Sequence, residues 1–122
     1  MPDFESHLRQ AERNERVASH LATFPDWQTV ALFYAALHYV DAYLAQRFGA
    51  QGHPTSHQAR LRFLARDPVL TGVYQQYREL LDRSQDARYN ALDVPEASAQ
   101  ELMREQFALV RSRIRTLLNL PP

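Results

Sequence analysis

The chain has 122 residues, contains no cysteine and balances 14 basic against 14 acidic residues, so its formal net charge at pH 7 is zero. The lack of cysteine excludes a thiolate nucleophile, a disulfide framework and a cysteine zinc site, and the neutral balance disfavours general binding of duplex nucleic acid. No apolar run is long enough for a membrane span or forms a signal-peptide core, so we expect a single cytoplasmic domain over residues 1–122.

The first half of the chain predicts two long helices. The first spans about residues 3–22, where Pro25 is expected to end it and Asp26 to cap the next. The second spans about residues 27–48 and is apolar nearly all round, so we expect it to be the central helix. The apolar stripe of the first helix consists of Phe4, Leu8, Ala11, Ala18 and Leu21.

A short helix and a longer one should follow the glycine loop. Thr55 and Gln58 have the spacing of a capping box, which opens a short helix ending near Ala65. Asp67 before Pro68 then opens a fourth helix over about residues 69–89. One face of that fourth helix carries Val73, Tyr77, Leu80, Ser84 and Ala87.

A final helix should run to about Asn119, opened either by Asp93 with Glu96 or by Ser98 with Glu101. Its apolar stripe is Met103, Phe107, Val110, Ile114 and Leu117. The whole pattern predicts an all-α fold, an up-and-down four-helix bundle with an additional short helix between helices two and four.

Three polar side chains interrupt the apolar second helix on one face. Tyr34, His38 and Asp41 stand at i, i+4 and i+7. A buried aspartate is costly without partners, so we expect the ionisable groups of helices two and four to converge inside the bundle. Arg78, Arg83 and Arg88 of the fourth helix are the candidate partners, and one of them should point inward. The cluster is either a satisfied core network or the floor of a pocket.

The same residues raise the question of a metal site. His38 and Asp41 could form half of one, with His53 and His57 as further ligands, but this spacing matches no strong metal motif. We therefore expect neither a metal nor a cofactor.

Four stretches resemble the HEPN superfamily, small helical-bundle domains found in prokaryotic toxin pairs and beside minimal nucleotidyltransferases. They are ALFYAALHYVDAYLA, HPTSHQARLRFL, YQQYRELLDRSQDARYN and SAQELMREQFALVRSRIRTLL, and they cover most of the chain from residue 27 on. The resemblance implies a homodimer whose role concerns RNA or nucleotides, or partnership with a nucleotidyltransferase in a toxin–antitoxin, stress or defence operon.

Active HEPN ribonucleases carry an arginine, a polar residue after it, and a histidine at the end of the helix that matches the fourth here. In the family, histidine moves the proton of the ribose 2′-hydroxyl and arginine holds the phosphate, without metal. Arg83 matches the arginine and Ser84 the polar position, but Arg88 stands where the histidine should be. An arginine cannot exchange a proton near neutral pH, so the matched site lacks its general base.

Histidines elsewhere in the chain could replace that general base. His38 or His57 could approach the fourth helix from elsewhere in the bundle. Arg47 and His53 satisfy the arginine-to-histidine spacing literally, but their stretch RFGAQGH leaves the second helix and enters a glycine loop. The catalytic candidates are therefore Arg83, His38 and His57.

The sequence favours a non-catalytic HEPN-like module with a pocket for a nucleotide, single-stranded RNA or another anion. A metal-independent endoribonuclease with a remodelled site and a purely structural bundle are the alternatives. The residues expected to line the pocket are Tyr34, His38, Asp41, His57, Arg83, Asp86, Arg88 and Tyr89.

Overall fold

The computed structural model describes residues 3–49 and 54–122, and every regular element in them is helical. The elements in chain order are α1 (Phe4–Ser19), α2 (Pro25–Phe48), α3 (His57–Arg66), the 3₁₀ turn η1 (Thr71–Val73), α4 (Tyr74–Tyr89), α5 (Glu96–Leu102), the π-helical segment η2 (Met103–Phe107) and α6 (Ala108–Leu117). The last three follow one another without a break, and we call them together the last helix. His53 lies outside the described residues.

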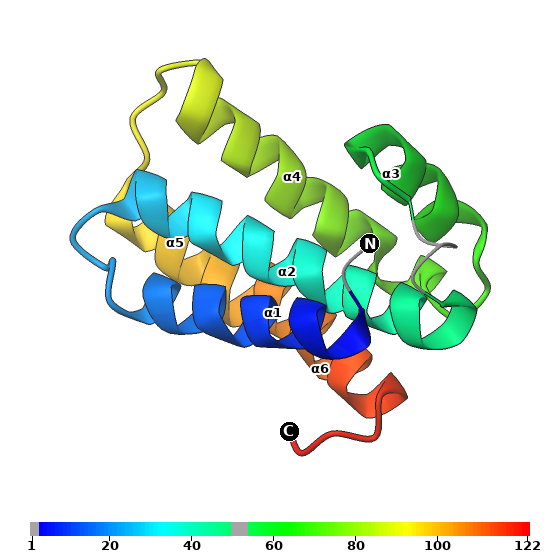
Figure 1. The fold of residues 1–122 in the computed structure, drawn as a ribbon. Helices are drawn as coiled ribbons and strands as arrows, with labels where there is room; N and C mark the ends of the chain where they lie inside the picture. Colours follow the sequence, from blue (N-terminus) through cyan, green and yellow to red (C-terminus); the bar gives the residue numbers. More distant parts are fainter. Residues whose placement is uncertain (1–2, 50–53) are drawn as a thin grey trace.

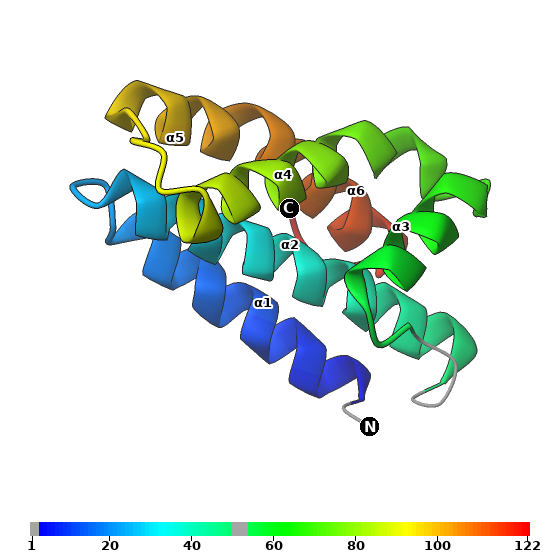
Figure 2. The ribbon, with the colours of Figure 1, turned by 90° about the horizontal axis from the view of Figure 1, so that it is seen from above.

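The helix α2 is the centre of the molecule, as its composition predicts. It packs against α1 on one side and against α4 on another, and the last helix packs against it from behind in the view of Figure 1. Viewed from above, α2 lies between α1 and the layer that contains α4 and α5 (Figure 2). The short α3 lies at one end, beside the start of α4.

The turn between α1 and α2 differs from the prediction. The helix α1 starts under an Asp3 cap and already ends at Ser19, and Pro25 is the first residue of α2 rather than the residue that stops α1. Proline suits this position because its missing N–H would have no helical partner there. Asp26 therefore lies in the first turn of α2 and does not cap it. The buried Gln28 side chain instead donates to the carbonyl of Ala18, at 2.9 Å, and ties the end of α1 to the start of α2.

The starts of α3 and α4 both differ from the prediction. The helix α3 has another capping residue, and α4 begins later in the chain. Ser56, not Thr55, caps α3, and its hydroxyl accepts the backbone N–H of Ala59 at 3.1 Å. Asp67 accepts the backbone N–H groups of Val69 and Leu70, which closes a tight turn. This turn and η1 use up the residues that we expected to open the long helix, so α4 begins only at Tyr74.

The last helix begins directly after Pro95, so neither proposed capping box opens it. The π-helical segment within it has no counterpart in the prediction. At its end, Asn119 has a φ of 58°. The N–H groups of Leu120 and Asn119 bond to the carbonyls of Arg115 and Thr116, a Schellman motif that turns the chain back along the helix.

The predicted apolar stripes face the core. On α4, Tyr77, Leu80 and Ser84 are buried, and on the last helix Phe107, Val110 and Ile114 are buried. The apolar ones among these side chains belong to the same hydrophobic cluster as the buried side chains of α2. In the part of the chain that the structure describes, no helix combines the length and the apolar character needed to cross a membrane.

The capping assignment for α3 can be tested by substitution. Ser56→Ala should lower the free energy of unfolding by about 1 kcal/mol, because one N–H of the first turn loses its acceptor. Thr55→Ala, at the neighbouring residue, is the matched control and should change the free energy of unfolding by less than about 0.5 kcal/mol. Urea unfolding followed by circular dichroism measures both. A larger loss for Thr55→Ala would restore the predicted capping box.

Candidate functional site

Asp41 lies in the C-terminal half of α2 and is 1% exposed. Its two carboxylate oxygens accept from Nε and Nη2 of Arg60 on α3, each at 2.8 Å. Arg60 is itself buried, so this is a planar, bidentate ion pair inside the protein. The expectation that an arginine of the fourth helix pairs with Asp41 is therefore wrong, because α3 brings Arg60 closer to it.

Arg83 and Asp86 lie away from the α2 polar residues. Arg83 pairs with Glu79 on the same helix, at 3.0 Å, and about 40% of each side chain is exposed. Asp86 accepts from the side chain of Asn90 at 2.7 Å. Both line a small hollow of about 110 Å³ against the loop before α5. They do not join Tyr34, His38 and Asp41 in one pocket.

His38 meets a histidine that the sequence analysis did not consider. Its Nδ1 is 3.0 Å from Nδ1 of His7 on α1, so one ring donates and the other accepts. Burial lowers the pKa of His38, and His7 and Arg60 lower it further, whereas Asp41 opposes the shift. Among the described residues, no three His, Asp or Glu side chains come together in a way that could hold a metal ion.

Arg88 is the arginine of α4 that points inward. Its Nη1 donates to the hydroxyl of Tyr34 at 2.7 Å, and its guanidinium lies 5.3 Å from the centre of that ring. It also lies 5.9 Å from the ring centre of Phe33. His57, the first residue of α3, contacts the same Phe33 ring with centroids 5.5 Å apart. The structure therefore brings Tyr34, His57 and Arg88 together.

Two exposed aromatic side chains extend this group to the surface. Tyr89 is 73% exposed and Trp27 is 59% exposed. Together with Asp26 and Arg88 they line a cavity of about 290 Å³ between the start of α2 and the end of α4. The Tyr89 ring lies 5.0 Å from the Arg88 guanidinium. This surface, Trp27, Arg88 and Tyr89 with Asp26, is called the aromatic–arginine site below.

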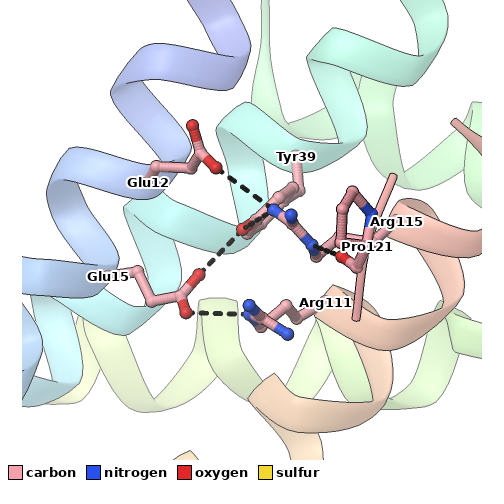
Figure 3. A network of polar contacts seen from close by, with 6 residues as sticks. All are labelled: Glu12, Glu15, Tyr39, Arg111, Arg115 and Pro121. Carbon is pink, nitrogen blue, oxygen red and sulfur yellow. Dashed lines mark hydrogen bonds and ion pairs between the residues drawn. The ribbon is translucent and has the colours of Figure 1, made fainter. Parts of the chain in front are cut away.

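A second polar network lies on another side of α2, and the sequence analysis missed it. Tyr39, which is fully buried, donates to Glu15 at 2.8 Å and accepts from Arg115 at 3.2 Å (Figure 3). Glu15 also accepts from Arg111, and Arg115 donates to Glu12. Burial and the bond to Glu15 raise the pKa of Tyr39 to about 12. The tyrosine is therefore a neutral donor at physiological pH.

The missed residues share one signal, a polar side chain on an apolar stripe. His7 follows the stripe of α1, Arg60 stands one turn before the buried Leu64, and Arg115 follows the buried Ile114. Polar interruptions of an apolar stripe therefore mark buried polar residues on α1, α3 and the last helix as well as on α2.

Comparison of the chain with protein-family models, curated proteins and solved structures finds no match.

The buried ion pair predicts a large difference between two arginines. Arg60→Met should lower the free energy of unfolding by about 3–5 kcal/mol, because it leaves the Asp41 carboxylate buried and unpaired. Arg83→Met should cost less than about 1 kcal/mol, since its pair with Glu79 is on the surface. Urea unfolding at pH 7 measures both. Equal effects would contradict the assignment of Arg60 as the partner of Asp41.

The burial of His38 beside His7 predicts a loss of stability in weak acid. Because the pKa of His38 is lowered in the folded state, the unfolded chain takes up its proton first as pH falls through about 6.5, and stability then declines. Unfolding measured from pH 7.5 to 5.5 should show this slope, and His38→Gln should reduce it. His20→Gln, at the exposed C-terminal cap of α1, is the control at a histidine outside this contact. A His38→Gln slope equal to that of wild type would contradict the assignment.

Proposed function

We propose that this chain is a HEPN-like four-helix-bundle module that binds a nucleotide, or one base of a single-stranded RNA, without cleaving it. The proposal rests on one observation: Arg88 and two exposed aromatic rings surround a single cavity. The resemblance of the sequence to HEPN proteins agrees with this role. Arg88 occupies the position of the catalytic histidine in that family, so this position serves binding in our proposal.

The chemistry of the aromatic–arginine site suits a base carrying a phosphate. Trp27 and Tyr89 offer flat rings, and stacking of a base on an aromatic side chain contributes about 1–3 kcal/mol. Arg88 has five N–H donors and uses only two of them within the described residues, for Tyr34 and for the carbonyl of Ser84. The remaining donors can pair with phosphate oxygens. Asp26 supplies an acceptor for the amino group of a base.

A metal-independent endoribonuclease is the second candidate, and one contact favours it. His57 and Arg88 both lie against the ring of Phe33, so a histidine stands beside the arginine after all. Burial, with smaller effects of Arg60 and Arg88, lowers the pKa of His57. This shift keeps the imidazole neutral at pH 7, which is the form that a general base requires.

Trp27 is the only tryptophan in the chain, so its fluorescence reports directly on the proposed site. Titration with AMP, ATP and a short uridine oligomer should quench it, whereas inorganic phosphate alone should not. Tyr89→Ala and Arg88→Gln should each weaken binding about tenfold, a loss of about 1.4 kcal/mol. Arg88→Gln should also flatten the dependence of binding on salt concentration.

Arg83→Gln is the matched control, since Arg83 is on the same helix but lies outside this site. It should bind as the wild type does. Absence of quenching with every nucleotide and oligomer would contradict the proposal and leave a purely structural bundle.

Cleavage of labelled single-stranded RNA in the presence of EDTA separates the two candidate functions. A binding module leaves the RNA intact at every pH from 5 to 9. Cleavage that is lost in both His57→Gln and Arg88→Gln would instead establish the endoribonuclease.

A further inference from the structure

The side of the molecule between α1 and the last helix carries a groove that the nucleotide site does not use. Its volume is about 470 Å³, within the range of small-molecule sites. Met103 and Ala108 of the last helix are only partly buried and give it an apolar wall, behind which lie the buried side chains of Leu32 and Phe107. The ion pairs Arg111–Glu15, at 2.8 Å, and Arg115–Glu12, at 3.2 Å, run from one helix to the other beside it (Figure 3).

The apolar wall of the groove is built by an irregular piece of helix. Met103 and Phe107 are the first and last residues of the π-helical segment. Single turns of π-helix are rare and often occur at functional sites. Phe107 is 3% exposed, whereas Met103 is only partly buried and has a flexible side chain that adapts its shape to a neighbour.

The charged side chains that line the groove include one more arginine than carboxylates. Two carboxylates and three guanidinium groups line it, which gives a formal net charge of +1. Glu12 and Glu15 are each engaged by an arginine of α6, and Glu15 is also held by Tyr39. Arg16 is exposed at the edge of the groove and makes no ion pair with any residue that the structure describes. An anion entering here would meet a cation that no carboxylate already neutralises.

We propose that this groove binds a small amphipathic monoanion, a carboxylate attached to an extended apolar body. The carboxylate pairs with Arg16, and the apolar body lies against Met103 and Ala108. The ion-paired network links α1 to α6 beside the groove, and it stays in place because its own charges are already satisfied. This site is independent of the aromatic–arginine site, and either can exist without the other.

Three ligands with the same ten-carbon chain test the proposal: decanoate, decanol and decyltrimethylammonium, each below its micellar concentration. The chain has two methionines, so a ¹³C-methyl methionine spectrum of the full protein has two signals, and Met103→Leu identifies the one from the groove. Decanoate should shift the Met103 signal in a saturable way. Decanol and decyltrimethylammonium should bind at least tenfold more weakly. Equal binding of the cationic ligand would overturn the proposal.

Two variants test whether decanoate binds in the groove, and a third variant is the control. Ala108 lines the groove and is only partly buried, so Ala108→Phe should fill the groove and abolish the shift, with an unchanged melting temperature as proof of folding. Arg16→Gln should weaken decanoate binding about three- to tenfold. Arg13→Gln, an exposed arginine of α1 outside the groove, should leave it unchanged. Binding of decanoate that survives Ala108→Phe would place the ligand elsewhere and contradict the proposal.

Discussion

The pair between Asp41 and Arg60 constrains the rest of the structure. A carboxylate buried on the most apolar helix needs a charged partner, and Arg60 supplies two hydrogen bonds of 2.8 Å. Arg60 and Leu64 are the only buried residues of α3. The ion pair of Arg60 with Asp41 therefore largely determines where α3 lies. A buried ion pair contributes little net stability compared with an apolar pair of similar size. Its effect here is to fix one position for a short helix whose other apolar side chains, Leu61 and Phe63, are only partly buried against the core.

The position of α3 in turn shapes the candidate site. With Arg60 bound to Asp41, the first residue of α3, His57, lies against Phe33 beside Arg88. The Tyr39 network emerges from nearly the opposite side of α2, because positions 39 and 41 lie about 200° apart around a helix axis. One central helix therefore connects two polar groups, one toward α3 and α4 and the other toward α1 and α6. This arrangement leaves two separate surfaces available for ligands.

The sequence predicted the helices well because apolar residues recur with helical spacing, and burial of those stripes decides the packing. It predicted their ends less well, since neighbouring polar side chains compete for one capping position, as Thr55 and Ser56 do. Tyr34, His38 and Asp41 could be singled out because they interrupt an apolar segment. The partner of Asp41 could not be identified from the sequence, because arginines of two helices were equally able to reach it. Only the tertiary arrangement selects Arg60. The π-helical segment has no local sequence signal of the kind that marks a cap or a turn.

A double-mutant cycle tests the central claim most directly. Unfolding free energies of the wild type, Asp41→Asn, Arg60→Gln and the double variant give the coupling between the two side chains. We predict a coupling of at least about 1.5 kcal/mol for Asp41 with Arg60, and none beyond about 0.5 kcal/mol when Arg83→Gln replaces Arg60→Gln. A coupling near zero for Asp41 with Arg60, or a larger one with Arg83, would contradict the account.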